Sequence, residues 1–459
     1  MLNKNENFSA ITYTIAVLFP SNLYKVRSPM QNTKKLALAV LVQTALISTA
    51  FASEQSESKG FVEDAEGSVL FRTGYLTRDK KNGAADTSSA AQTAMVKIES
   101  GYTQGTVGFG VGIIGDTSFK LGKNGHTDNQ MIPTHPQNNA DGTKDAYDYW
   151  TRGGGIVKAR ISNTEVRYGT HVLDLPVLAS NTTRLVPEYF EGVLATSREI
   201  NGLELTAGKF TKDQMSHQIN TDGNHLDRAV VWGAKYKFND AFNASYFGLD
   251  SKDTLDRHYV NANYKQALAN NSSLSYDFSG YHTEWDKGAS ASSSTLPSTS
   301  SDRSNNIWAL SGTYNQDAHN VMLAYQQSTG NTGYAYGENA DGFQSIYLPN
   351  SYLSDFNGRG EKSVQVQYSL DFAGYGVPGL SWTTAYVYGW DIDTATDDNA
   401  KESELFNQVK YTVQSGFAKD ASLRLRYSHY RNDDAYANDY YMPDTNEWRI
   451  WLDIPVKFF

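Results

Sequence analysis

From residue 67 to the C-terminus, segments of about ten residues alternate apolar and polar side chains, with turn-forming residues between them. Successive side chains on a strand point to opposite faces, so each segment has one apolar and one polar face. A tilted strand needs about 9–11 residues to cross a bilayer. The pattern therefore predicts an all-β chain that forms a transmembrane antiparallel β-barrel, with lipid outside and water in the lumen.

Short and long connections alternate between these segments. The short ones include Asn201-Gly202, which favours a two-residue hairpin turn, and the long ones include the Ser-rich segment 285–303 and the segment 329–360. Outer-membrane barrels have short periplasmic turns and longer extracellular loops, so about 18 strands would leave both termini in the periplasm. The expected strands are 67–78, 95–104, 106–115, two arms of a hairpin at Ser162-Asn163, 188–199, 203–212, 228–238, 242–250, 257–267, 272–284, 305–315, 319–328, 361–372, 380–390, 403–414, 421–430 and 447–459.

One hairpin leads into a loop of unusual composition. Its arms alternate Lys158, Arg160 and Arg167 with apolar residues. The loop that follows, 171–187, is nearly uncharged and rich in Leu and Val, and its one arginine is Arg184. Apolar side chains are seldom left in water over such a length, because their exposure is unfavourable. We therefore expect the loop to fold inward and narrow the channel as a constriction loop.

The C-terminal segment behaves as a barrel-closing strand. Its apolar face carries Trp448, Ile450, Leu452, Ile454, Val456 and Phe458. Its other face carries Glu447, Arg449, Trp451, Asp453 and Lys457. The alternative, an edge strand of a soluble sheet, would expose the whole apolar row to water, where such edges associate. A strand that ends on Phe and faces lipid is the better interpretation.

The composition and the N-terminal end agree with export to the outer membrane. The chain has 30 Tyr, no Cys and only 11 Pro, so long strands are permitted and disulfides are excluded. Residues 30–52 match a secretory signal peptide, with an apolar run at 36–50 and a cleavage site at Ala50-Phe51-Ala52. Residues 1–29 precede its basic region and are interpreted as an over-long start. We expect residues 53–459 to form a single barrel domain.

Several separated strings resemble the OprD family of outer-membrane porins. They occur in the family's order over essentially the whole exported chain. The strings are ESKGFVEDA (57–65), ESGYTQGTVGFGV (99–111), GGIVKARISNTEVRYG (154–169), TRLVPEYFEG (183–192), SDFNGRGEKS (354–363), YGVPGL (375–380) and VKYTVQSGFAKDASLRLRYSHYR (409–431). The resemblance implies an 18-stranded channel in the bacterial outer membrane. It would pass small carboxylate-bearing solutes such as amino acids, aromatic acids and, incidentally, carbapenem antibiotics.

The resemblance also implies a ladder of basic side chains along one wall of the lumen. The matching residues are Lys410, Arg424, Arg426 and Arg449. The alternation along the strand agrees with this. Arg424 and Arg426 alternate with leucines, so they share one face of the strand, and that face should be the lumen side because a charge facing lipid at midplane costs about 2–4 kcal/mol. Arginine can hold a carboxylate with two bonds and pass it to the next site. The alternative is a set of structural ion pairs with acids of the lumen.

Two further residues match the family's constriction. Arg184 matches the loop arginine, with pairing to Glu188 or Glu191 as the alternative. Asp355 matches an acid that faces the basic side in channels for basic amino acids, and capping of a turn is its alternative. Both are expected to contact solute.

Three departures put a preference for arginine-like solutes in doubt. Leu353 stands where basic-amino-acid channels of the family have Tyr, Gln344 where they have Asp, and Lys209 where they have His. Fewer acids at the constriction would weaken the selection of a cationic side chain. Neutral and aromatic carboxylates therefore remain open as solutes.

Other functions find little support. The histidines have no triad or metal-ligand spacing, and no Ser lies in a G-x-S-x-G, so we expect no catalytic residue, metal site or cofactor. The acids of Asp391-Ile392-Asp393-Thr394 leave a bound Ca²⁺ as a minor alternative. The net charge of −10 comes from loops such as 391–404 and 433–444 and does not oppose anions in the pore.

Nucleic acid is not an expected partner. The expected partners are small carboxylates, outer-membrane lipid and lipopolysaccharide, for a monomer or weak homo-oligomer. The alternatives are an outer-membrane barrel hydrolase and a general, weakly selective porin.

Overall fold

The computed structural model describes most of the chain that follows the expected signal peptide. The described residues are 53–81, 83–122, 126–127, 129–140, 143–221, 226–289, 303–337, 342, 344–439 and 442–459. The expected over-long start 1–29 and signal peptide 30–52 lie outside these residues, as does most of the Ser-rich segment 285–303. Within the described part, no helix is long and apolar enough to span a bilayer.

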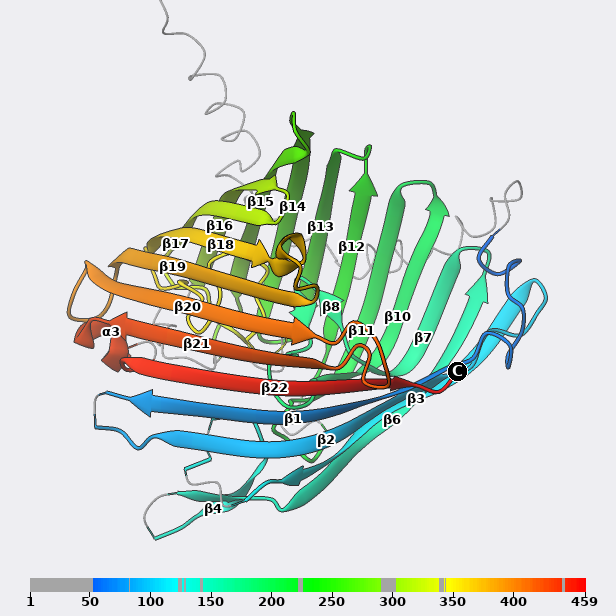
Figure 1. Cartoon of the computed structure of the whole chain (residues 1–459), viewed down its shortest axis with the longest axis horizontal. Coiled ribbons are helices and arrows are strands. Elements are labelled where there is room, and N and C mark those ends of the chain that lie inside the picture. Colours follow the sequence, from blue (N-terminus) through cyan, green and yellow to red (C-terminus); the bar gives the residue numbers. More distant parts are fainter. Residues whose placement is uncertain are drawn as a thin grey trace, which may run out of the picture.

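Eighteen antiparallel strands form one closed sheet (Figure 1). These strands are β1 (Glu66–Lys80), β2 (Thr87–Glu99), β3 (Val107–Lys120), β6 (Tyr149–Ile161), β7 (Thr164–His171), β10 (Tyr189–Ile200), β11 (Leu203–Gln214), β12 (Ala229–Lys237), β13 (Phe242–Ser251), β14 (Leu255–Ala267), β15 (Ser272–Trp285), β16 (Arg303–Gln316), β17 (His319–Gly330), β18 (Lys362–Asp371), β19 (Leu380–Ile392), β20 (Ala400–Thr412), β21 (Ser422–Asn432) and β22 (Thr445–Lys457). The connections contain the short elements β4 (Thr134–Asn138), β5 (Lys144–Ala146), β8 (Asp174–Leu175), β9 (Leu178–Ala179), η2 (Phe372–Tyr375) and α3 (Asp434–Asp439).

The first and last strands of the barrel pair with each other. The register of β1 and β22 runs from Ser68 opposite Lys457 to Lys80 opposite Thr445. This pairing confirms the expected role of the C-terminal segment. The expected class, an antiparallel barrel of 18 strands, is likewise confirmed.

The second strand differs from the expectation. We expected it at 95–104, but β2 ends at Glu99 and begins earlier, at Thr87. The chain turns away after Glu99 because Gly101 packs against Gly60, where a Cβ atom would lie 2.1 Å from the carbonyl oxygen. Gly105 completes the turn with φ of 113°, a conformation that favours glycine.

Large apolar side chains cover the outer face of the barrel. Leu310 and Leu323 on neighbouring strands are 51% and 60% exposed, and Phe109 and Val157 are similarly exposed elsewhere around the wall. Lipid would solvate such a band, whereas water would not. Residues of the opposite parity are mostly buried or polar, so they face the lumen.

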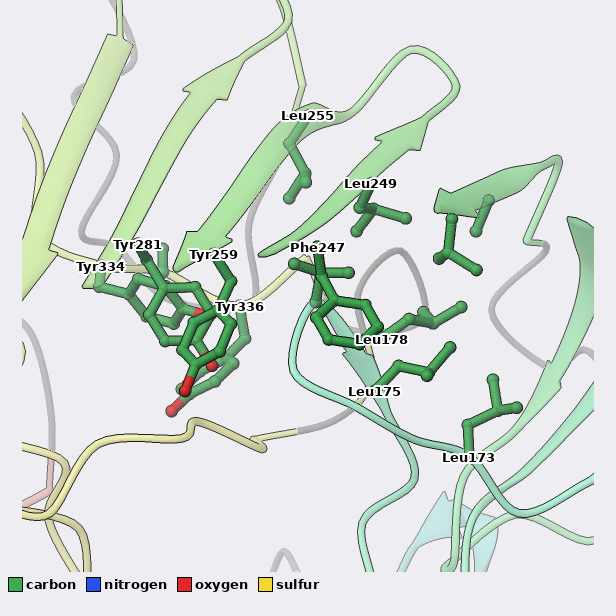
Figure 2. Packing of buried hydrophobic residues seen from close by; sticks show 14 of the residues in the cluster. Leu173, Leu175, Leu178, Phe247, Leu249, Leu255, Tyr259, Tyr281, Tyr334 and Tyr336 are labelled. Atoms are coloured by element: carbon green, nitrogen blue, oxygen red, sulfur yellow. The ribbon is translucent and has the colours of Figure 1, made fainter. Parts of the chain in front are cut away.

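The segment 172–188 leaves the wall after β7 and returns at β10. Its Leu175 and Leu178 lie next to Phe247 of β13 in Figure 2, and Tyr281 of β15 belongs to the same buried cluster. The Tyr281 hydroxyl donates a hydrogen bond to the carbonyl oxygen of Pro176, at 3.0 Å. These wall residues face inward, so the segment, which we call the inner loop, lies on the lumen side of the wall.

The inner loop also reaches the other side of the barrel. Arg449 of β22 donates to the carbonyl oxygen of Thr183 at 3.4 Å. Arg72 of β1 donates at 3.4 Å to the carbonyl oxygens of Arg184 and Leu185. The inner loop therefore links two walls of the lumen, through apolar packing on one side and polar contacts on the other.

Candidate functional site

The expected ladder residues lie on three neighbouring strands. Lys410 of β20 is directly opposite Arg424 of β21, and Arg426 of β21 is directly opposite Arg449 of β22. Directly opposite residues of an antiparallel pair have Cβ atoms about 4.5–5.5 Å apart. The alternate residue Leu423 is 42% exposed on the outer face. The structure thus brings these four cations together on one wall, which we call the basic wall.

Arg72 of β1 belongs to the same wall and was missed from the sequence. It lies opposite Asp453 of β22, and its Nε and Nη2 atoms donate to the two carboxylate oxygens at 2.7 and 2.9 Å. Its guanidinium also stacks over Trp451, 5.3 Å from the ring centroid. The alternation around Arg72 was a usable signal for its inward face. Its contacts with Asp453 and Trp451 of β22 could not be predicted, since these residues are far from Arg72 in the sequence.

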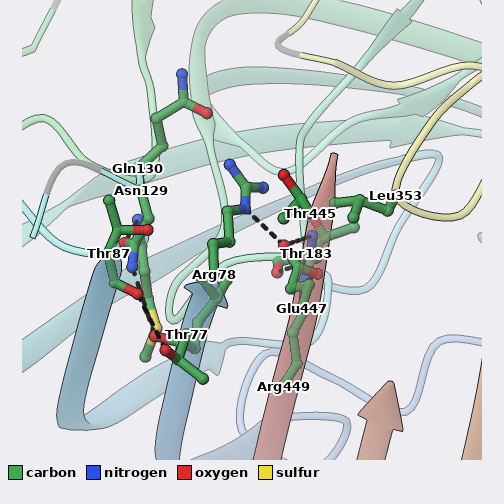
Figure 3. A network of polar contacts seen from close by, with 12 residues as sticks. Thr77, Arg78, Thr87, Asn129, Gln130, Thr183, Leu353, Thr445, Glu447 and Arg449 are labelled. Carbon is green, nitrogen blue, oxygen red and sulfur yellow. Dashed lines mark hydrogen bonds and ion pairs between the residues drawn. The ribbon is translucent and has the colours of Figure 1, made fainter. Parts of the chain in front are cut away.

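Two of the five cations are held by carboxylates. Arg72 pairs with Asp453, as described above. Arg449 donates from Nη2 to Glu447 at 3.1 Å, and a second bond joins Arg449 Nε to the same carboxylate. Arg78 donates to Glu447 at 2.7 Å from the other side (Figure 3). The geometry of Arg449 therefore matches a structural ion pair, which was the alternative to a ladder position that binds solute.

The other three cations have no carboxylate partner among the described residues. Lys410 is exposed to the lumen, and Arg424 and Arg426 are half-buried. Arg426 lies over the ring of Phe406, 4.9 Å from its centroid. Cations directly opposite one another repel. Glu447 and Glu404 act on Arg426 from a longer distance, and Asp453 acts on Arg424, but no carboxylate of the described residues forms an ion pair with either arginine. The arrangement can therefore accept anions.

Arg184 lies in the inner loop between the two loops that it contacts. Its Nη1 donates to Thr183 Oγ1 at 2.7 Å, and its Nη2 lies 3.3 Å from the side-chain oxygens of Gln130 and Gln344. Glu191, one of the alternative partners, pairs with Lys212 at 2.9 Å on the outer face. Gln344 thus places a neutral amide against the guanidinium.

Asp355 is held inside the loop 331–361. Its carboxylate accepts hydrogen bonds from Tyr336 Oη at 2.7 Å and from the Ser351 hydroxyl. Burial raises the pKa of Asp355, whereas these hydroxyl donors and the charge of Arg184 act in the opposite direction. Both donors are side chains of the same loop, so the carboxylate ties the loop together and lies within electrostatic range of Arg184.

The basic residues of the first hairpin form a separate cluster. Lys158 and Arg167 both contact Glu99, at 3.0 and 2.7 Å. Arg160 stacks over Tyr102, 4.1 Å from the ring centroid. All three lie inside the barrel at the end with the short turns, where Lys158 and Arg167 share Glu99 and Arg160 contacts Glu54 and Gln55.

Two other sequence features have simpler structural roles. Asp391 pairs with Lys362 at 2.8 Å, and Asp393 pairs with Arg359 at 2.7 Å. Among the described residues, no three or more His, Cys, Asp or Glu are arranged to hold a metal ion. Lys209 is exposed on the outer face rather than in the lumen, because its neighbours Gly208 and Phe210 face inward.

Comparisons with known proteins agree with this geometry. A family model described as "outer membrane porin, OprD family" matches residues 59–458. Porin D of Pseudomonas aeruginosa is 37% identical over 92% of this chain and 98% of its own length. The crystal structure of Acinetobacter baumannii OccAB1 has a TM-score of 0.84 and 66% identity, covering 89% of this chain and 100% of that chain. A crystal structure of Pseudomonas aeruginosa OpdK with vanillate has a TM-score of 0.76 and 26% identity, covering 87% and 100%.

Proposed function

Because the chain belongs to the OprD family of outer-membrane porins, we propose that it is a channel for the facilitated diffusion of small carboxylate-bearing solutes along the basic wall. Amino acids and aromatic acids are the expected solutes, and carbapenem antibiotics would pass incidentally. Porins are channels without catalytic activity, which excludes the barrel hydrolase. The solute gradient alone drives the transport.

The observation that carries the proposal is the group of cations without carboxylate partners. Lys410, Arg424 and Arg426 follow one another across β20 and β21. A carboxylate that enters a narrow pore loses water, and charge-assisted hydrogen bonds offset that loss by about 1.5–3 kcal/mol each. Successive sites of similar strength let the anion move on instead of remaining bound. A general, weakly selective porin would not need such a one-sided wall.

In this proposal the inner loop forms the constriction. The loop crosses between the aromatic side of the lumen and the basic wall. Arg184 is 3% exposed, and Thr183, Gln130 and Gln344 occupy its donors, so it would act at the narrowest level through its positive charge. Asp355 acts on the same region through Arg184 and adds the acidic part of a field that suits zwitterions.

The side chains around Arg184 support neutral over cationic solutes. Gln344 supplies an amide where the family's basic-amino-acid channels have a carboxylate. A positively charged side chain of a solute would therefore meet Arg184 without a compensating acid at that position. The relative OpdK was crystallised with vanillate, an aromatic carboxylate, which supports aromatic acids as solutes.

Swelling of proteoliposomes tests the proposal directly. The purified protein is reconstituted, and uptake is compared for neutral amino acids, basic amino acids, aromatic acids and uncharged solutes of equal size. We expect carboxylates to enter faster than size-matched uncharged solutes. Uptake that depends on size alone would contradict the proposal and favour a general porin.

A further inference from the structure

The barrel wall is incomplete on one side of β6. The pairing of β6 with β7 ends at Ile156 opposite Gly169, although β6 continues outward to Tyr149. After β7 ends, the chain leaves the wall as the inner loop and returns to the wall at Tyr189, the first residue of β10. Residues 149–155 of β6 therefore pair with β3 alone. A free strand edge at membrane depth is unfavourable unless something covers it.

Two adjoining hollows of about 440 and 490 Å³ run along this free edge. They share Gly153 and Gly154, so they form one elongated groove, which we call the edge groove. Its sides on the outer face include Val111, Val157 and Tyr168, which are 48%, 56% and 56% exposed. The groove thus opens to the apolar band of the barrel, where lipid chains lie.

Glycines leave the groove without side chains along β6. A Cβ atom on Gly155 would meet only the carbonyl oxygen of Gly112, at 3.7 Å, so the space above it is open. Gly153 has φ of 147°, in a region that other residues rarely adopt. The inner side of the groove carries polar residues such as Thr170, Gln214 and Thr221. Its outer side is apolar and lies over bare backbone, where an unbranched hydrocarbon chain fits.

A lysine on the lipid face lies on β11, two strands from the groove residue Tyr168 and outside the groove lining. Lys209 of β11 is directly opposite Val193 of β10, which is directly opposite Tyr168 of β7. Lys209 therefore continues the outward-facing row that borders the groove. It is exposed, and within the described part of the chain no carboxylate forms an ion pair with it. A lipid-facing lysine is unfavourable by about 2–4 kcal/mol at midplane and by about 0–1 kcal/mol near the headgroups. An anionic headgroup next to Lys209 would offset that cost.

A second cation, Lys212, lies three residues further along β11 than Lys209. Lys212 is exposed on the same strand and contacts Glu191, a residue that lines the groove, at 2.9 Å. The groove lies towards the end of β6 that is remote from the short turn at Ser162-Asn163. Long connections mark that end as the extracellular one. The side chains of both lysines can extend towards the headgroups of the outer leaflet.

We propose that the edge groove binds one molecule of lipopolysaccharide through its lipid A part. An acyl chain of the lipid lies along β6 over Gly153 and Gly155, and a phosphate of the lipid meets Lys209. The bound chain covers the free edge, and the phosphate compensates the lysine. Apolar slot and cation together match an anionic lipid, and the extracellular level matches the leaflet that holds lipopolysaccharide.

Native mass spectrometry of the whole protein tests this proposal. The protein is stripped of lipid in detergent and then titrated with purified lipid A or with phosphatidylglycerol, which shares the phosphate and the acyl chains. We expect one lipid A to bind, with phosphatidylglycerol weaker by about tenfold. The variant Gly155→Leu fills the slot and should weaken lipid A binding about tenfold. Lys209→Gln should weaken it by about fivefold, as expected for one cation at a membrane surface.

Matched variants on other parts of the lipid face serve as controls. Gly312 faces outward on β16, where a Cβ atom would meet nothing within 4 Å, and Lys401 is exposed on β20. Gly312→Leu and Lys401→Gln should leave lipid A binding unchanged. If Gly155→Leu does not fold, the lipid A binding of Lys209→Gln compared with that of Lys401→Gln still tests the proposal.

Three outcomes would overturn the proposal. Equal binding of phosphatidylglycerol would reject lipopolysaccharide as the ligand. Equal lipid A binding by all variants would reject the groove as the site. Dimers that disappear in Gly155→Leu, without any change in lipid A binding, would show that a second copy of the chain covers the edge.

Discussion

Two arginines that face the same lumen show how differently its two sides are built. Arg257 of β14 is 1% exposed, donates to Thr283 Oγ1 at 2.9 Å and to the carbonyl oxygen of Ala335 at 2.8 Å, and stacks over Tyr334. Arg424 is half-buried on the basic wall and has no hydrogen-bond or ion-pair partner among the described residues. The charge is the same, but the protein itself uses the donors of Arg257 and leaves those of Arg424 for a solute.

The surroundings explain this difference. Arg257 lies beside the packed tyrosines and leucines that hold the inner loop and the loop 331–361. That side of the lumen is filled by protein and serves to support the loops. The basic wall meets the inner loop through only a few polar contacts, so its cations stay accessible. An arginine in a channel therefore acts on solutes only when its donors are not already occupied.

The strongest test of this comparison removes the accessible arginines. The double variant Arg424→Ala and Arg426→Ala should slow the uptake of a small carboxylate about tenfold, since a loss near 1.4 kcal/mol raises the barrier by that factor. Uptake of a neutral solute of similar size should hardly change. Liposome swelling measures both rates.

High salt provides an independent control for the same variant. Screening should weaken the preference of the wild-type protein for carboxylates and leave the double variant unaffected. Equal slowing of charged and neutral solutes in the variant would indicate that the two arginines shape the pore sterically.

A smaller effect is expected for Lys410. This lysine is exposed, and exposed charge interactions contribute up to about 1 kcal/mol. Lys410→Gln should therefore slow carboxylate uptake about threefold in the same assay. A tenfold loss would place the main barrier at Lys410 instead of at the two arginines.

A still smaller change should follow from a new acid at Arg184. Gln344→Asp puts a carboxylate near the Arg184 guanidinium, which contacts the Gln344 side chain and already contacts other groups. We expect the uptake of arginine relative to a neutral amino acid to rise about twofold, because Arg184 neutralises much of the added charge. Competition between the two amino acids in liposomes measures the ratio, and Gln344→Asn is the matched neutral variant.

The smallest effect on selectivity is expected at Arg257. Arg257→Met should change the ratio of carboxylate to neutral uptake by less than about twofold, since its charge does not reach the solute. The variant should nevertheless lose about 1–3 kcal/mol of stability, because the carbonyl group of Ala335 loses its donor. Denaturant unfolding measures the stability, and a large loss of carboxylate preference would contradict the distinction between the two sides.

The architecture could be predicted from the sequence because alternation encodes both the strand and its faces. The inward parity of Arg424 and Arg426 was correct for this reason. The early part of β2 was missed because Thr87–Ala94 has small residues on both faces apart from Gln92 and therefore little contrast. Small side chains suffice there because loop residues such as Asn129 cover them from inside.

The pairing of charges could not be read from parity alone. Arg449 and Arg426 share the same predicted face, yet Arg449 is held by Glu447 and Arg426 is not. The contact between Arg72 and Asp453 joins positions 381 residues apart, so it depends on the closure of the whole barrel. Parity gives the face of a side chain, whereas its partners follow from register and from the position of the loops.

The pairing of β1 with β22 also has a consequence for assembly. Every other barrel contact between consecutive strands can form as a local hairpin, but this one must wait until the last residues have left the transport machinery. Until then the growing sheet has two open edges, which favour association with other chains. Loss of the final residues should therefore stop insertion altogether, because nothing else in the chain can take the place of the closing strand. The ion pair between Arg72 and Asp453 would then act as a check on alignment, since a shift of β22 by one residue would turn Asp453 towards lipid and leave Arg72 without its partner.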